Sequence, residues 1–398
     1  MTYVLLLTTA VALVLLWLER IRLDRSRRAI PLVITVTGTR GKSTVTRMLA
    51  SALRADGRRV LSKTTGSEAV VELPDGSVRE IDRRGHPSIL EQKQVIHLAA
   101  KLRVEVAVIE VMSIHRENHL VESHKIIRPD IVLVTNFRVD HTAAAGSTRA
   151  DMASVIGLDI PPGARAFVLQ HESLPAFRAA VAGGGGELME VVSGADGEVP
   201  NSHSTDRPGF IDNCDLVYAA CRSLQLDENA IRIGFSSAAR DIGSLRAWHY
   251  RADGSGPDCV LVSAFAANDP DSTMRIYASV MKVVRPAEGC CVGLLSLRHD
   301  RGDRTLQWAE ALEMGALRQF SHLYMCGVHA PALERRLKPR RGTTELVVLR
   351  RSQPSEITRI VTSELGGGGG VVFGFGNIGG VGKELIAHWS ELAEPFDI

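Results

Sequence analysis

The chain contains 398 residues, with a hydrophobic content of 45% and a formal net charge of +2. The balance of 47 basic against 45 acidic residues argues against a nucleic-acid-binding protein, which gathers basic residues on one face. The composition also excludes extensive disorder. The six cysteines include no C-x-x-C pair, so we expect buried free thiols and neither a zinc site nor a disulfide framework. The length favours two to three domains.

The first part of the sequence is apolar. No charged residue occurs from Thr2 to Leu18, and the stretch that follows contains Arg20, Arg22, Arg25, Arg27 and Arg28. About 17 helical residues span roughly 26 Å, which is enough for the hydrocarbon core of a bilayer. Because the positive charges follow the apolar run, the pattern differs from that of a signal peptide. We predict a single-pass anchor in the cell membrane at residues 1–18, a basic linker at 19–31 and a cytoplasmic body. A buried core helix is the alternative interpretation.

The rest of the chain is predicted to be α/β. Continuous apolar runs indicate buried strands at Leu32–Val36, Val104–Val111 and Ile131–Thr135. The spacing of apolar residues in Ser43–Asp56 is helical. Uninterrupted apolar strands that alternate with helices are typical of a parallel sheet covered on both faces.

A second, smaller α/β domain is predicted in the carboxy-terminal part of the chain. The stretch 251–257 is rich in turn-forming residues, and a new apolar strand at Cys259–Ser263 follows it. We therefore place the first domain at residues 32–255 and the second at 256–398.

The most informative segment joins the first strand of the body to its first helix, and reads Thr37-Gly-Thr-Arg-Gly-Lys-Ser-Thr44. Two glycines turn backbone N–H groups toward an anion, and the helix N-terminus adds partial positive charge. In such a loop the lysine reaches the terminal phosphates and the serine hydroxyl ligates magnesium. The full P-loop pattern has glycine where this chain has Val36, so the match is to the shorter form G-T-x-G-K-[ST]. We predict nucleotide binding by Gly38, Thr39, Arg40, Gly41, Lys42, Ser43 and Thr44.

Polar residues follow two of the predicted strands. Glu110 lies at the end of one apolar strand, where a carboxylate is costly unless it meets a cation; a strand-edge glutamate in solvent is the alternative. Asn136, Asp140 and His141 follow the next strand. Ligands of open α/β sheets bind beyond the carboxyl ends of strands. We therefore predict Glu110 and His141 as metal ligands, with Asp140 orienting the histidine.

Together these motifs resemble the Mur ligase superfamily, which comprises ATP-dependent enzymes that join a carboxylate to an amine. Phe265–Thr273 resembles the segment that opens the last domain of these enzymes, and Phe210–Ala220 resembles one of their helices. Over nearly the whole chain, the sequence also resembles the ligase subunits of bacterial poly-γ-glutamate (capsule) synthases. This second resemblance is carried by the anchor with its basic flank, GKSTVTR, Lys63-Thr-Thr-Gly66, Glu91-Gln92, Phe265-Ala-Ala-Asn-Asp269, Arg298-x-Asp-Arg-x-Asp-Arg-Thr305 and Gly374-x-Gly-Asn-Ile378.

The resemblance implies that ATP phosphorylates a γ-carboxylate of glutamate or of a growing chain, and that the amine of the next glutamate attacks the acyl phosphate. It implies catalytic roles for Lys42, Glu110 and His141, with magnesium held by Ser43, Glu110 and His141. It further implies nucleotide contacts at Asn136, Asn213, Asn268 and Asp269. Small transmembrane synthase subunits are implied as partners, and self-association of the chain is left open. Many relatives use a carbamylated lysine, but no lysine lies between Lys125 and Lys282.

Three arginines are candidate contacts of the anionic chain, namely Arg298, Arg301 and Arg304. A surface turn in which they pair with Asp300 and Asp303 is an equal alternative.

Two further motifs favour structural roles. Gly374–Gly379 matches G-x-G-x-x-G, but a dinucleotide site needs an acidic residue on a following strand, so we expect a tight turn near the substrate. His115 and His119 lack the glutamate position of H-E-x-x-H, so we expect a polar face near the site.

Two competing functions remain. The first is another Mur-type ligase such as a folylpolyglutamate synthase, and the second is a membrane-tethered P-loop NTPase without ligase activity.

Overall fold

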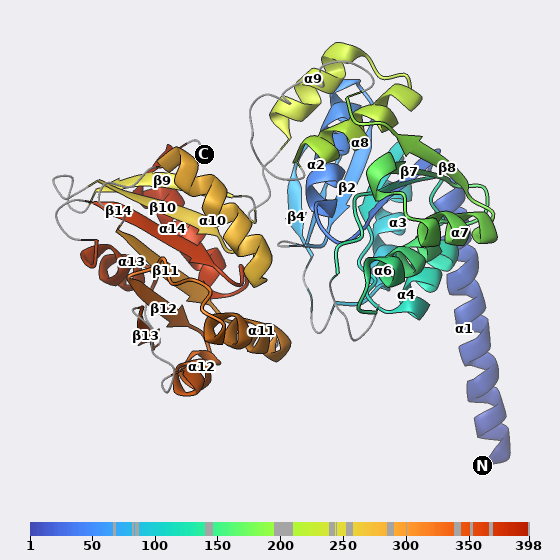
Figure 1. Cartoon of the computed structure of the whole chain (residues 1–398). Coiled ribbons are helices and arrows are strands. Elements are labelled where there is room, and N and C mark those ends of the chain that lie inside the picture. The colour runs from blue at the N-terminus through green and yellow to red at the C-terminus, as the bar shows by residue number, and fades with distance from the viewer. Residues whose placement is uncertain are drawn as a thin grey trace. The chain divides into compact units, whose positions relative to one another are not determined.

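The computed structural model describes residues 1–66, 69–81, 83, 87–139, 146–194, 210–238, 243, 245–251, 258–284, 290–299, 301–337, 344–350, 353–365 and 369–396. The chain forms two compact units, Met1–Arg240 and Asp241–Ile398, each built around its own sheet (Figure 1). The domain boundary that the sequence predicts, after residue 255, lies later in the chain than the boundary between these two units, which follows Arg240. It would separate β9 (Arg246–Arg251) from β10 (Asp258–Ala264), although these two strands pair with each other.

The sheet of the first unit has eight strands in the order β4-β3-β2-β5-β1-β6-β7-β8. Their bounds are β1 Leu32–Thr37, β2 Val60–Thr64, β3 Val70–Glu72, β4 Val78–Glu80, β5 Val106–Glu110, β6 Ile131–Val134, β7 Arg165–Leu169 and β8 Glu187–Val191. All pairs from β2 to β8 are parallel, and β3 and β4 extend one edge in antiparallel pairs. The carboxyl ends of β2, β5, β1 and β6 therefore lie side by side, which brings residues distant in sequence to one edge.

Helices cover both faces of this sheet, because neighbouring strand residues point to opposite sides. Ile34 packs into a cluster with α2 (Lys42–Ala55), α8 (Phe210–Ser223) and α9 (Glu228–Ser237), whereas Val33 packs into a separate cluster on the other face. The helical segments of that other face are α1 Thr2–Arg28, α3 Glu91–Lys101, α4 Arg116–Leu120, η1 Val121–Ile127, α6 Arg149–Ile156, η2 Gly157–Asp159 and α7 Pro175–Gly184. A 3-10 turn, η3, spans Gln170–Glu172.

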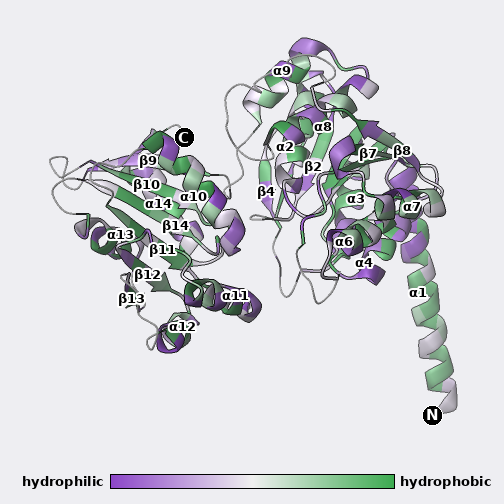
Figure 2. Cartoon of the chain, in the orientation of Figure 1, coloured by the Kyte–Doolittle hydropathy of each residue, from purple (hydrophilic) through white to green (hydrophobic). Residues whose placement is uncertain are grey.

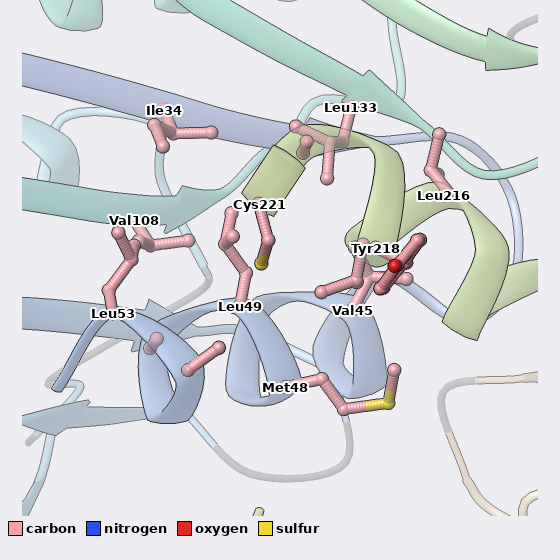
Figure 3. Packing of buried hydrophobic residues seen from close by; sticks show 14 of the residues in the cluster. Ile34, Val45, Met48, Leu49, Leu53, Val108, Leu133, Leu216, Tyr218 and Cys221 are labelled. Carbon is pink, nitrogen blue, oxygen red and sulfur yellow. The ribbon is translucent and has the colours of Figure 1, made fainter. Parts of the chain in front are cut away.

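The central helix α2 forms because its apolar residues recur at helical spacing. Five buried apolar residues of this helix lie on one stripe, namely Val45, Met48, Leu49, Ala52 and Leu53, and Ala50 is buried beside them. In Figure 3, Leu49 points between the sheet residue Val108 and Cys221 of α8. Burial of this stripe fixes α2, and with it the loop that precedes the helix, against the sheet.

The first helix extends beyond the expected anchor into the expected linker. α1 continues without a break from Thr2 to Arg28, so the basic stretch expected as a linker is helical. Its residues 2–18 are exposed, as the projecting, largely hydrophobic helix in Figure 2 shows, and the helix is long and apolar enough to cross a bilayer. Its last part packs on the body, because Leu23 is 3% exposed and Arg27 is 9% exposed.

Polar contacts fasten this last part of α1. Lys93 Nζ lies 2.7 Å from Glu19 Oε1. The Arg27 guanidinium donates to Asp130 Oδ2 at 2.7 Å and to three backbone carbonyls. Arg27 therefore attaches the last part of α1 to the body. The alternative of a buried core helix does not hold for residues 2–18, because that apolar stretch is exposed.

The second unit has seven strands in the order β13-β12-β11-β14-β10-β9-β15. The further bounds are β11 Cys291–Ser296, β12 His322–Cys326, β13 Glu345–Leu349, β14 Gly370–Phe375, β15 Glu394–Phe396, α10 Pro270–Val284, α11 Gly302–Glu313, α12 Ala330–Leu337, α13 Pro354–Ser363 and α14 Val381–Leu392. The strands from β13 to β10 pair in parallel, and β9 and β15 add antiparallel pairs. All six cysteines are free thiols, and only Cys290 is partly exposed.

Candidate active site

The predicted nucleotide-binding segment Thr37–Thr44, the phosphate loop, joins β1 to α2, as the sequence predicts. Gly38 has a φ of 119° and Gly41 a φ of 85°, so both adopt the left-handed conformation that glycine tolerates. A side chain at Gly38 would also overlap Thr135, which directly follows β6. The loop therefore turns tightly against the edge of the neighbouring strand and leads into the amino end of α2.

Lys42 and two asparagines stabilise this loop. Lys42 Nζ donates to the Gly38 carbonyl at 2.8 Å, which holds the ammonium over the loop. The Asn136 amide Nδ2 donates to Arg40 O at 3.0 Å, and its Oδ1 accepts from Arg40 N at 3.3 Å. Asn213 lies against the other glycine, since a Cβ at Gly41 would be 2.8 Å from its side-chain amide. The structure thus brings both asparagines to the loop. Their expected contacts with the nucleotide stay predictions.

A hydroxyl and a carboxylate meet beside the loop. Glu110, the last residue of β5, is 2% exposed, and its Oε2 accepts from Ser43 Oγ at 2.9 Å and from Thr65 N at 2.8 Å. Gly66 passes so close that a Cβ there would lie 2.7 Å from Ser43 Oγ. Three adjacent strands therefore deliver these groups, and the alternative of a solvated strand-edge glutamate does not hold.

The donor set suits magnesium. Hydroxyl and carboxylate oxygens are ligands that Mg²⁺ prefers, and the ion usually takes one or two carboxylates together with substrate phosphates. Within the described ranges, no group of three or more His, Cys, Asp or Glu side chains forms a complete protein cage. Ser43 and Glu110 fit the partial protein shell that a magnesium–nucleotide complex needs.

Two predicted residues, Asp140 and His141, lie outside the described residues. The metal-ligand role of His141 therefore stays a prediction.

A buried polar network lies behind Glu110. Gln92 Nε2 donates to Glu110 O at 3.2 Å and to Glu122 Oε1 at 2.6 Å. Glu122 also accepts from the backbone and hydroxyl of Ser113. Burial raises the pKa of Glu122, and these hydrogen bonds oppose the shift. The network fixes the chain that leaves β5 and lines the site.

A fully buried lysine, Lys63, lies on the neighbouring strand β2. Its Nζ lies 3.6 Å from Glu91 Oε2, and Arg83 pairs with both oxygens of Glu91 at 2.8 and 3.0 Å. Burial lowers the pKa of Lys63, and the negative charges of three neighbouring glutamates oppose this. Sequence reasoning gave these residues no role, although the Lys63-Thr-Thr-Gly66 and Glu91-Gln92 motifs contain them.

A pocket of about 190 Å³ opens at this edge of the sheet. One part of its lining consists of the phosphate loop, Lys42, Thr65, Gly66 and Glu110. The rest consists of residues 111–114, His119 and three apolar side chains of α6. The pocket therefore combines a polar wall at the phosphate loop with a largely apolar one.

The second unit places its candidate residues at the ends of strands. Asp269 Oδ1 accepts from Ser272 N at 2.8 Å, which makes this carboxylate an amino-terminal cap of α10. Arg298 lies against Gly379, where a Cβ would be 2.9 Å from Nη1, so this arginine reaches the glycine turn after β14. Any nucleotide or substrate contact of these residues, and of Asn268, stays a prediction.

The other two arginines already have partners within the unit. Arg301 pairs with Asp303 at 3.3 Å, as the surface-turn alternative expects. Arg304 is buried and donates to Gln307 Oε1 at 2.9 Å. Asp300 lies outside the described residues.

Comparisons with known proteins agree with this arrangement. Residues 36–155 match the Mur ligase middle domain, and residues 249–392 match the C-terminal domain of poly-gamma-glutamate synthase CapB. A phosphate loop of this form on a parallel sheet, followed by that second domain, is typical of Mur-type ATP-dependent ligases, and the chain resembles the Mur ligase superfamily over these two ranges.

More particularly, the chain is similar to CapB proteins. It is 29% identical over 296 residues to the capsule biosynthesis protein CapB of Bacillus anthracis, covering 74% of this chain and 63% of that protein. It is 27% identical over 394 residues to the PGA synthase CapB of Bacillus subtilis, covering 96% of each. Its fold resembles that of the bifunctional folylpolyglutamate synthase/dihydrofolate synthase of Yersinia pestis complexed with AMPPNP and Mn, with a TM-score of 0.67, 16% identity and coverage of 94% of this chain and 92% of the other. The predicted α/β fold of the Mur ligase type is confirmed.

Proposed function

We propose that this chain is a membrane-anchored, ATP-dependent ligase that joins glutamate units through their γ-carboxyl groups. The names of the two CapB proteins, a capsule biosynthesis protein and a PGA synthase, support this product. The contact of Ser43 with Glu110 beside the phosphate loop is the observation that carries the proposal. It provides ligands for a metal at the place where the terminal phosphate of ATP would lie.

The proposed chemistry has two steps. The γ-carboxylate of one glutamyl unit attacks the γ-phosphorus of ATP, which gives an acyl phosphate and ADP. The amine of the next glutamate attacks the acyl carbon, phosphate leaves, the nitrogen gives up a proton, and an amide remains. Such a phosphoryl transfer depends mainly on positioning and on positive charge.

The residues of the first unit divide this work. Lys42 and the N–H groups at the start of α2 bind the phosphates. Ser43 and Glu110, with the predicted ligand His141, would hold a magnesium ion, which neutralises phosphate charge when bound. Gln92 holds the backbone carbonyl of Glu110, and Thr65 N donates to the Glu110 carboxylate that faces Ser43. Arg298, Arg301 and Arg304 stay candidate contacts of the anionic polymer.

The exposed apolar part of α1 supports the membrane anchor. The arginines that follow it favour a cytoplasmic location of the ligase units. Small transmembrane synthase subunits are proposed partners on the basis of the resemblance alone.

The test measures ADP release by membranes that contain the full chain, with ATP and magnesium, with and without glutamate. We expect glutamate to stimulate ADP release and a glutamate polymer to form. Lys42→Ala should abolish both, whereas Lys101→Ala, which changes an exposed lysine at the end of α3, should leave both intact. Hydrolysis at the full rate without glutamate would contradict the ligase proposal and favour a P-loop NTPase.

A second candidate is a folylpolyglutamate-synthase-type ligase, because the fold resembles the Yersinia pestis enzyme over most of both chains. This candidate predicts addition of glutamate to a folate acceptor and no polymer from glutamate alone. Product sizing with and without folate separates the two candidates.

A further inference from the structure

His119 is a buried histidine that lines the proposed ATP pocket. It lies on α4 and is 5% exposed, and the same pocket is lined by Lys42 and Glu110. The proposed function assigns His119 no role, because neither the phosphate-binding residues nor the metal ligands include it.

The ring is held by a fully buried carboxylate. His119 Nδ1 lies 2.9 Å from Asp159 Oδ1. Asp159 also accepts from Ser123 Oγ at 2.9 Å and from Thr37 Oγ1 at 2.5 Å, so it is tied to the end of β1. These bonds fix the ring, and an ionised Asp159 requires Nδ1 to carry a proton. The second nitrogen, Nε2, has no hydrogen-bond partner in the part of the chain that the structure describes.

The surroundings favour a positive charge on this ring. Burial lowers the pKa of His119, but Asp159, by its charge and its hydrogen bond, and Glu122 raise it, and the net shift is upward. Lys42 is the cation that opposes this shift. A protonated histidine presents Nε2–H as a charged hydrogen-bond donor.

The wall around His119 has a mixed character. Its apolar side chains are Met112, Ile114, Met152, Val155 and Ile156, and Ser113 adds a hydroxyl. A ligand that fits such a wall has a short aliphatic stem and an anionic group. A glutamyl unit has both, since a chain of three carbons separates its two carboxylates.

We propose that His119 binds the α-carboxylate of the glutamyl unit whose γ-carboxylate is phosphorylated. The γ-carboxylate then lies toward Lys42 and Glu110, and the stem of the unit lies against the apolar wall. His119 is thus a substrate-binding residue that selects an acid with a second carboxylate. This inference rests on the proposed function and adds a recognition element to it.

The test compares His119→Ala and His119→Gln with His115→Gln, which changes an exposed histidine just before the same helix. The full chain is assayed in membranes, and KM is measured separately for glutamate and for ATP. Loss of a charged hydrogen bond should raise the KM for glutamate about 10- to 100-fold. The KM for ATP should stay within about twofold, as should both constants of His115→Gln.

A pH series adds a readout that a purely structural role would not change. The wild-type KM for glutamate should rise as the pH passes the raised pKa of His119, and in His119→Gln it should not depend on pH in that range. Binding of a non-hydrolysable ATP analogue shows that each variant is folded.

Three outcomes would overturn the inference. An unchanged KM for glutamate in both His119 variants removes the proposed contact. A rise confined to the KM for ATP would show that His119 binds a phosphate instead. A wild-type chain that shows no glutamate-dependent turnover overturns the proposed function itself, and this inference falls with it.

Discussion

Replacing Gly66 by alanine should separate nucleotide binding from stability. The new Cβ would lie 2.7 Å from Ser43 Oγ and 3.7 Å from Glu110 Oε1, and the first distance is shorter than real Cβ contacts. Ser43 must therefore rotate away or the loop must retreat, and either change breaks the hydrogen bond of Ser43 to Glu110. The backbone of Gly66 lies outside the left-handed region, so the substitution adds no backbone strain.

The size of the effect follows from the bond that is lost. A hydrogen bond to a charged group contributes about 1.5–3 kcal/mol, which corresponds to roughly a 10- to 100-fold loss of affinity for the magnesium–nucleotide complex. The free energy of unfolding should change by less than about 1 kcal/mol, because a Gly-to-Ala change at an ordinary backbone conformation stabilises slightly.

Calorimetric titration with a non-hydrolysable ATP analogue, with and without magnesium, measures this effect. The matched control is Gly183→Ala, where a Cβ would meet no atom within 4 Å and the backbone is also outside the left-handed region. Without magnesium, the wild type and both variants should bind the analogue with similar, weaker affinity. If Gly66→Ala binds the magnesium complex within about twofold of the wild type, the assignment of Ser43 and Glu110 as partners of the metal is wrong.

Three other predictions concern the stability of the first unit, measured as the midpoint of urea unfolding. Leu49→Ala removes a fully buried side chain and should cost about 2–5 kcal/mol; a cost below about 1 kcal/mol would contradict the packing of α2. Arg27→Ala removes four hydrogen bonds and should cost about 2–4 kcal/mol, whereas exposed Arg25→Ala should cost less than about 0.5 kcal/mol; equal effects would refute the docking of α1. The raised pKa of His119 gives a stabilisation that is complete below about pH 6.5 and is lost as the pH rises through the folded pKa. Asp159→Asn should abolish this pH dependence, and its persistence in the variant would refute the pairing.

The phosphate loop could be predicted because its information is local. The strand, the two glycines, Lys42 and Ser43 are contiguous, and each residue type is required by the tight turn into a helix. Glu110 could be predicted as well, because a carboxylate at the end of an apolar strand needs a partner, and parallel strands end at the same edge. The contact of Glu110 with Ser43 follows from the pairing of β5 with β1.

The wall opposite the loop could not be predicted in the same way. His119 and Asp159 are separated by 40 positions, and an aspartate in Gly157-Leu-Asp159 has the local pattern of a turn residue. Only the packing of η2 against α4 and η1 turns it into a buried acceptor. Lys63 is similar, because a lysine in an apolar strand becomes buried only when folding brings Glu91 to it. The sequence likewise does not indicate that Asp269, a predicted nucleotide contact, caps its own helix.

Because α1 is one unbroken helix, it joins its exposed apolar part to the first unit rigidly, without a flexible linker. Any tilt imposed on residues 2–18 is passed directly to the sheet, because Arg27 joins that helix to the segment leading into β6. Under the proposed anchoring, the thickness of the bilayer would therefore set the orientation of the phosphate loop relative to the membrane surface. Successive turnovers would then occur at one fixed height above that surface. A flexible spacer inserted between residues 18 and 19 would free that height without altering a single residue of the pocket.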